Sequence, residues 1–281
     1  MSPFEIKLPI HQTSCVIFNS PHSGRNYPKE FLEMSSLPLT SLRSSEDVFV
    51  DEIISPIVNL GSILMAAIFP RCYVDLNRDH KELDPLLVRD LKNFSKTPKV
   101  SAGLGVIPRV VDMQRGIYSK KISKKEVKER IDTVYFPYHN KLGEMISHTH
   151  SLFQKVILLD CHSMPSIMEK NKSDKDSADI VLGDCYGASC ENSILLLLRR
   201  LLSEQGFRVD INTPFSGGFI TKNYSNPEKN YHAIQIEFLR SLYCNEKTFK
   251  HSPTFPDFQR RVVLVFQQFL SIVSNFYFFQ L

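Results

Sequence analysis

The segment KVILLD, residues Lys155 to Asp160, runs without a break into Cys161, His162, Ser163 and Met164. An apolar run of this length that ends in polar residues is typical of a fully buried strand in a parallel sheet. Similar runs recur along the chain, at Ser14–Asn19, Ile63–Ile68, Ala178–Gly183, Phe207–Asn212 and His232–Leu239. We expect all of these segments to be strands.

Segments with helical spacing of their apolar residues separate the expected strands. They are Val48–Leu60, Lys120–Thr149, Asn192–Gln205 and Phe255–Tyr277. Pro137 is expected to kink or break the second of them, because proline removes a helical hydrogen bond. Gly206 is the expected C-cap of the third. Strands that alternate with helices indicate an α/β fold with a mostly parallel sheet, which binds its ligands beyond the carboxyl ends of the strands.

The composition is that of an ordinary folded protein with a weak positive charge. Of its 281 residues 42% are apolar and 23% are charged, which excludes a disordered or fibrous chain. The formal net charge of +4 suits a small anionic ligand and is too small to indicate binding to nucleic acid. We expect one domain over residues 1–281, with an irregular insertion or lid at residues 81–121.

Cysteine usage and the N-terminal sequence favour a cytoplasmic protein. The six cysteines form no CxxC pair and are expected to be reduced thiols. The chain begins without a basic stretch followed by an apolar run, so we expect no signal peptide. No uninterrupted apolar window of about 18 residues predicts a membrane span. The oligomeric state stays open.

Two histidines come directly after expected strands. His22 follows the run Ser14–Asn19, and His162 follows KVILLD. Two imidazoles and one carboxylate, with one position left for water, are the ligands of catalytic zinc. Glu46 and Asp47 are the candidate carboxylates, and Asp160 is placed to support His162 through its second ring nitrogen. Each histidine alone also fits a surface position or a structural role in the core. The two lie far apart in sequence, so they form no local metal motif.

Other polar residues suggest substrate binding and proton transfer. Asn77 and Arg78 together can bind one carboxylate, or they form only a surface salt bridge. Glu237 lies within an apolar strand segment, either as a general base or as a structural carboxylate paired with Arg240. The pair Gly217–Gly218 allows close backbone approach, in a substrate-facing loop or in an ordinary tight turn.

An ordered set of short motifs resembles the N-formylglutamate amidohydrolase family, from about residue 15 to about residue 245. The motifs are NSPHSG (Asn19–Gly24), SED (Ser45–Asp47), Pro70-Arg71, VDLNR (Val74–Arg78), ELDP (Glu82–Pro85), GVIPR (Gly105–Arg109), PYH (Pro137–His139), DCHSM (Asp160–Met164), PFSGG (Pro214–Gly218) and QIE (Gln235–Glu237). The family is distantly similar to zinc carboxypeptidases and aspartoacylases. That similarity implies a three-layer α/β sandwich with a mostly parallel mixed sheet, of the zinc carboxypeptidase-like (phosphorylase/hydrolase-like) kind.

The resemblance also implies an activity. The expected reaction is metal-dependent hydrolysis of the N-acyl amide of an acidic amino acid, with N-formyl-L-glutamate giving formate and L-glutamate. The expected cofactor is Zn²⁺ or another divalent metal, and the expected partner is a small anionic N-acyl amino acid. The resemblance implies metal ligation for His22, His162 and Glu46 or Asp47, binding of a substrate carboxylate for Asn77 and Arg78, and the role of catalytic base for Glu237. From the residues themselves we further expect substrate binding by Arg71, Gly217 and Gly218, and a catalytic role for Arg109.

One position departs from the carboxypeptidase pattern. There the first histidine and its glutamate stand three residues apart, as HxxE, whereas this chain has Arg25 at that place. The carboxylate ligand is therefore expected from elsewhere, with Glu46 as the first choice and Asp47 as the second. Two other functions stay open: a metallo-carboxypeptidase or peptidoglycan-peptide amidase with the same site, and a non-catalytic protein that binds an acidic metabolite.

Overall fold

The structure is a computed structural model that describes residues 2–92, 94–111, 115–166 and 178–275. Its contacts divide the chain into two compact units. Unit 1 comprises Met1–Glu5, Pro21–Asp47 and Ala66–Leu142, and unit 2 comprises Ile6–Ser20, Val48–Met65 and Gly143–Leu281. The expectation of one domain over the whole chain stays a prediction.

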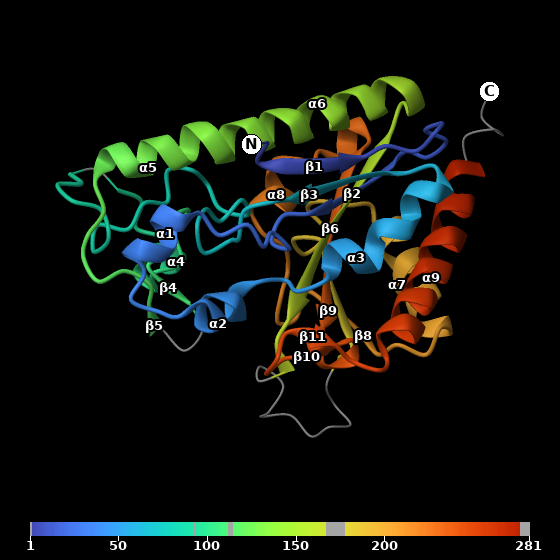
Figure 1. Ribbon diagram of the computed structural model, residues 1–281. Coiled ribbons are helices and arrows are strands. Elements are labelled where there is room, and N and C mark those ends of the chain that lie inside the picture. Colours follow the sequence, from blue (N-terminus) through green and yellow to red (C-terminus); the bar gives the residue numbers. More distant parts are fainter. Residues whose placement is uncertain (1, 93, 112–114, 167–177, 276–281) are drawn as a thin grey trace. The chain divides into compact units, whose positions relative to one another are not determined.

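A seven-stranded sheet, most of it in unit 2, has the strand order β1-β3-β2-β6-β9-β7-β8. Its strands are β1 (Phe4–Lys7), β2 (Val16–Ser20), β3 (Ile63–Ala67), β6 (Val156–Met164), β7 (Ile180–Gly183), β8 (Val209–Ile211) and β9 (Tyr231–Leu239). Strand β6 is parallel to β2 and β9 (Figure 1). Strand β7 is parallel to β8 and antiparallel to β9. The predicted α/β fold with a mostly parallel mixed sheet is confirmed.

Residues alternate along the central strands between an apolar face and a polar face. On β6, Ile157, Leu159 and Cys161 join one apolar cluster, to which β9 contributes Ile234, Ile236 and Phe238. The same cluster includes residues of helices α3 (Val50–Ile54), α7 (Asn192–Glu204) and α9 (Phe255–Asn275), so these helices cover that face. The intervening residues point to the opposite face. They include Asp160, His162, Gln235 and Glu237.

The predicted helices are present, with local departures. Val48–Leu60 divides into α3 and a 3-10 stretch, Ser55–Leu60, that has a proline in its first turn. Helix α7 ends as predicted before Gly206, whose φ of +79° suits glycine. Residues 276 and 277 of the last predicted helix lie outside the described residues. None of the described helices combines the length and the apolar character that a membrane span needs.

The predicted helix at Lys120–Thr149 is continuous through Pro137 but changes its winding. Helix α5 (Lys124–Arg130) leads into a π-helical stretch, Ile131–Tyr135, and then into α6 (Phe136–Phe153). The Phe136 N–H donates to the Ile131 carbonyl, one residue further back than in an α-helix. This wider turn directly precedes Pro137, which has no N–H to donate. The proline therefore changes the helix locally without ending it.

The described residues between 81 and 121 belong to unit 1, and most of them lie outside helices and strands. Their described elements are α4 (Pro98–Ser101), β4 (Val110–Val111) and β5 (Arg115–Gly116). A small apolar cluster of unit 1 joins this segment to helices α1 (Lys29–Met34) and α2 (Leu39–Leu42); its buried members are Phe31, Leu42, Cys72, Val111 and Ile117. The role of a lid stays a prediction. Other short elements are α8 (Phe219–Asn223), β10 (Cys244–Asn245), β11 (Lys250–His251) and the 3-10 stretches Arg43–Ser45, Pro227–Lys229 and Arg240–Leu242. No disulfide joins any of the six cysteines, all of which are described.

Candidate metal centre

His22 lies in the loop after β2, where the backbone fixes its position. At Gly24 an added Cβ would lie 2.1 Å from the Phe69 carbonyl oxygen, so only glycine fits. The Asp47 N–H donates to the His22 carbonyl at 3.0 Å, and the Ser23 hydroxyl donates to the Asp47 carbonyl at 3.0 Å. The motifs NSPHSG and SED are therefore joined by one backbone hydrogen bond and one hydrogen bond from a side chain.

Both ring nitrogens of the buried His22 face carboxylates. Nδ1 lies 3.3 Å from Asp47 Oδ2, and Nε2 lies 2.7 Å from Asp75 Oδ1. Burial raises the pKa of Asp75, but Arg71, Arg78 and His22 together hold that pKa well below its usual range. An ionised Asp75 therefore orients the imidazole so that Nδ1 is turned toward Asp47.

Strand β6 presents His162 next to a carboxylate of the same strand. Because β6 continues to Met164, His162 is a strand residue and does not lie in a loop after the strand. Its Nε2 lies 3.0 Å from Asp160 Oδ2, and Asn19 Nδ2 donates to Asp160 Oδ1 at 2.7 Å. The predicted support of His162 by Asp160 is confirmed. Because Nε2 contacts Asp160, Nδ1 of the ring points away from that carboxylate.

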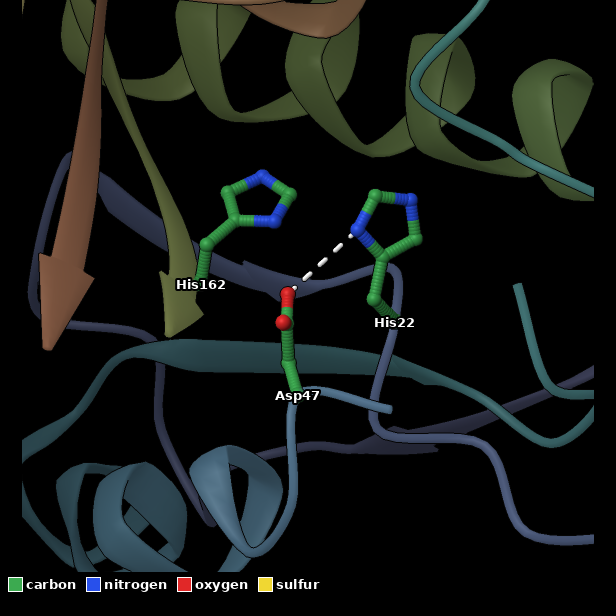
Figure 2. A group of neighbouring side chains, drawn as sticks. All are labelled: His22, Asp47 and His162. Atoms are coloured by element: carbon green, nitrogen blue, oxygen red, sulfur yellow. Dashed lines mark ion pairs between the residues drawn. The ribbon is translucent and has the colours of Figure 1, made fainter. Parts of the chain in front are cut away.

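The side chains of His22, Asp47 and His162 point toward one another (Figure 2). One ligand atom of each lies within 4.8 Å of the others, and all three residues are buried. No other set of three His, Cys, Asp or Glu side chains in the described part of the chain meets this condition. Two imidazoles and a carboxylate, with each imidazole backed by a further carboxylate, match the ligands of catalytic divalent metals. The donor set therefore fits zinc.

Of the two adjacent carboxylates, Asp47 and not Glu46 faces the histidines. The fully buried Glu46 accepts hydrogen bonds from the Tyr27 hydroxyl at 2.6 Å and from Arg43 Nε at 3.1 Å. The backbone is extended at Glu46, and in extended backbone neighbouring side chains point to opposite sides. Asp47, the second choice of the sequence analysis, is therefore the candidate carboxylate ligand in this structure.

Glu237 occupies the position on β9 that pairs with His162 on β6. Both side chains leave the polar face of the sheet. The buried Glu237 carboxylate accepts a hydrogen bond from Gln235 Nε2 at 2.8 Å. Arg240, considered as a structural partner for Glu237, donates to Ser163 Oγ at 2.9 Å. Glu237 thus lies next to a candidate metal ligand, and its role as a base stays a prediction.

The DLNR motif folds around Asp75. The Asn77 N–H donates to Asp75 Oδ1 at 2.9 Å, Arg71 Nη2 donates to Oδ2 at 2.9 Å, and Arg78 Nη2 lies 4.0 Å from Oδ2. The Tyr135 hydroxyl, at the end of the π-helical stretch, donates to the Arg78 carbonyl at 2.7 Å. These contacts hold two guanidinium groups near one carboxylate. Asp75 is part of the VDLNR motif in the sequence, but its contact with His22 was not predicted.

Lys99 adds a cation that the sequence analysis missed. Burial and the nearby charges of Arg78 and Arg71 lower the pKa of Lys99 from its usual 10.5. Arg71, Arg78 and Lys99 therefore bring three positive charges near the carboxylates of Asp75 and Glu82. The region therefore suits an anionic ligand. No motif marks Lys99, and its only signal in the sequence was its place within residues 81–121.

Arg109 and Gly217–Gly218 have structural contacts of their own. Arg109 Nε donates to the buried Asp84 at 2.7 Å. Gly217 has a φ of +120°, and a Cβ added to Gly183 would lie 2.7 Å from the Gly217 nitrogen. Since Gly183 pairs with Gln235 across β7 and β9, this loop lies beside the polar face of the sheet. Catalysis by Arg109 and substrate contact by the loop stay predictions.

Solved structures share this fold. The crystal structure of an N-formylglutamate amidohydrolase from Ralstonia eutropha JMP134 is 32% identical in sequence, with a TM-score of 0.91, over 100% of both chains. A gene product of Agrobacterium tumefaciens has a TM-score of 0.69 at 14% identity and covers 97% of this chain and 95% of its own. At that identity the second likeness shows the fold alone.

Sequence comparisons agree with the structural likeness. The N-formylglutamate deformylases of Pseudomonas putida and Pseudomonas aeruginosa are each 28% identical over 191 residues, which is 67% of this chain. The chain spans 66% of the length of these curated relatives, just under two thirds. The model of the N-formylglutamate amidohydrolase family matches residues 14–244, which include all the candidate site residues. Because this match covers most of the sequence, the chain belongs to the N-formylglutamate amidohydrolase family.

Proposed function

We propose that this protein is a metal-dependent amidohydrolase that removes the N-acyl group from an acidic amino acid, with N-formyl-L-glutamate as its substrate. One observation carries the proposal: the ligand atoms of His22, Asp47 and His162 lie within 4.8 Å of one another in a buried setting. The names of the relatives, N-formylglutamate amidohydrolase and N-formylglutamate deformylase, support the choice of substrate.

His22, Asp47 and His162 would hold the divalent ion, and zinc suits this donor set. When bound, such an ion lowers the pKa of a water molecule and polarises the acyl oxygen. Asp75 and Asp160 bind Nε2 of the two imidazoles and so fix the orientation of each ring. These two carboxylates are therefore part of the proposed site.

Glu237 is the proposed general base. It takes a proton from the attacking water and returns it to the departing nitrogen, so that a hydroxyl adds to the acyl carbon as the C–N bond breaks. The products are formate and L-glutamate. Strand pairing with β6 places Glu237 beside His162, and Gln235 holds one of its carboxylate oxygens at 2.8 Å.

Cationic groups of unit 1 are the proposed anchors for the two carboxylates of the substrate. Arg71, Arg78 and Lys99 supply positive charge, and Asn77 supplies an amide. Arginine binds carboxylates through two parallel hydrogen bonds. Arg109, as a stabiliser of the developing oxyanion, and Gly217–Gly218, as a substrate-facing loop, complete the proposed site.

The proposal is tested by measuring formate release from N-formyl-L-glutamate. We expect hydrolysis by the purified protein, loss of activity on treatment with a chelator, and recovery on addition of zinc. N-acetyl-L-glutamate and a glutamyl peptide serve as competing substrates. Faster hydrolysis of the peptide would favour the carboxypeptidase alternative, and no hydrolysis by the zinc-loaded protein would contradict an enzymatic role.

A further inference from the structure

Gln235 is a buried amide residue beside the proposed base. It is 5% exposed and lies on β9 between Asp160 of β6 and Gly183 of β7, which pair with it in register. Its Nε2 donates to Glu237 Oε1 at 2.8 Å. The amide nitrogen thus faces Glu237, where the carboxylate oxygen accepts its hydrogen bond, and the amide oxygen points elsewhere.

The Gln235 amide oxygen is buried and accepts no hydrogen bond from any residue that the structure describes. Its neighbours in the sheet explain why. Asp160 already accepts from Asn19 and contacts His162, and a carboxylate has no hydrogen to donate. Gly183 has no side chain, and the backbone of Phe215–Gly217 packs closely over it. A buried acceptor without a donor is unfavourable, so this oxygen is a binding position for an N–H or O–H group of another molecule.

We propose that Gln235 is a positioning residue that binds the N–H of the scissile amide. The inference rests on the proposed function, since an N-acyl amino acid carries one N–H, on the nitrogen that leaves. When the Gln235 oxygen accepts this N–H, the nitrogen is held next to the carboxylate that must protonate it. One amide group then orients both reactants, Glu237 through Nε2 and the substrate through Oε1. Gln235 thereby favours secondary amides over esters.

The test compares N-formyl-L-glutamate with 2-(formyloxy)pentanedioate, the ester in which oxygen replaces the N–H group. In Gln235→Met, which keeps the length of the side chain and removes its polar atoms, we expect kcat/KM for the amide to fall about 5- to 10-fold further than kcat/KM for the ester. Gln235→Glu keeps an acceptor oxygen but places a carboxylate beside Glu237. It should slow both substrates by similar factors.

The control is Ile236→Val, a small change at the next residue of β9, whose side chain faces the apolar cluster. It should leave the amide-to-ester ratio unchanged. Metal content and the midpoint of thermal unfolding are measured for every variant, so that loss of the fold is recognised. If Gln235→Met does not fold, Gln235→Asn should lower the same ratio, because its shorter side chain withdraws the oxygen.

The outcomes separate the two proposals. An unchanged amide-to-ester ratio in Gln235→Met, or in Gln235→Asn where Met does not fold, contradicts the role of Gln235 and leaves the proposed function standing. Failure of the zinc-loaded wild type to hydrolyse either compound contradicts the proposed function, and the assignment of Gln235 with it.

Discussion

His162 on β6 and Glu237 on β9 are in-register partners of two parallel strands, and their side chains leave the same face of the sheet. The ladder of backbone hydrogen bonds fixes the separation of these two backbone positions. Sites built on strands hold their side chains more accurately than sites built on loops. The proposed metal ligand and the proposed base therefore keep a constant relation to each other.

Replacing Glu237 with Gln should abolish most activity while the metal stays bound. The amide keeps the size of the side chain but cannot accept a proton from water, so kcat should fall on the order of 10²–10⁴-fold. Formate release and elemental analysis measure the two effects. Glu228→Gln, at an exposed position, is the control and should behave as the wild type. Full activity in Glu237→Gln would exclude this residue as the base.

The adjacent carboxylates Glu46 and Asp47 should respond differently to loss of charge. In Asp47→Asn we expect bound metal to be lost, because Asp47 and not Glu46 faces His22 and His162. In Glu46→Gln we expect metal to be retained and stability to fall, since Tyr27 and Arg43 lose a charged acceptor. Elemental analysis and thermal unfolding separate the two cases. Metal loss in Glu46→Gln alone would show that Glu46, and not Asp47, is the ligand.

The choice between these two residues shows what the sequence could supply and what it could not. The residue types predicted a carboxylate ligand at Glu46 or Asp47. Which of the two faces the histidines depends on the backbone conformation at Glu46, which is extended. The contact between His22 and Asp75 joins residues 53 apart in sequence, and no local pattern reveals such a contact. Asp160, by contrast, was predictable because it stands two residues before His162 on the same strand.

The strands were predictable because each buries a short apolar run, and the helices because their apolar residues have a period near 3.6. The end of β6 was not predicted. His162 follows the predicted strand Lys155–Asp160 in the sequence, yet it belongs to β6 and faces the polar side of the sheet. Pro137 marked a disturbance of the helix, but a π-helical turn before a proline follows no sequence rule that we could apply. Lys99 went unnoticed because its proximity to Arg71 and Arg78 arises only in the folded chain.

Removal of the Lys99 charge should weaken substrate binding more than catalysis. In Lys99→Gln we expect KM for N-formyl-L-glutamate to rise about 3- to 10-fold with kcat little changed. The rise is modest because a partly exposed charge contributes little binding energy. The difference from the wild type should shrink at high salt, because salt screens the interaction. Lys92→Gln, an exposed lysine of the same segment, is the control. An unchanged KM in Lys99→Gln would remove Lys99 from the anchors.

The stability of the protein should fall in mild acid because of His232. Burial and the nearby charge of Lys155 lower the pKa of His232 from 6.5 to about 4. The unfolded chain therefore binds a proton between pH 6.5 and 4 that the folded chain does not, so stability decreases as pH falls through this window. The loss should amount to about 2 kcal/mol.

The pH dependence is measured by urea unfolding of the wild type and of His232→Gln between pH 7 and pH 4.5. The variant lacks the titrating group, so its stability should vary less with pH across this interval. His148→Gln removes an exposed histidine and should keep the slope of the wild type. Equal slopes in His232→Gln and the wild type would show that another group causes the acid sensitivity.

The most direct test of the metal centre is elemental analysis of the purified protein after equilibration with zinc and removal of the free ion. We predict about one zinc ion per chain in the wild type and almost none in His162→Ala or Asp47→Asn. Asp160→Asn should retain zinc with an affinity about 10- to 100-fold lower. A wild type without zinc, or a His162→Ala variant with as much zinc as the wild type, would contradict the account.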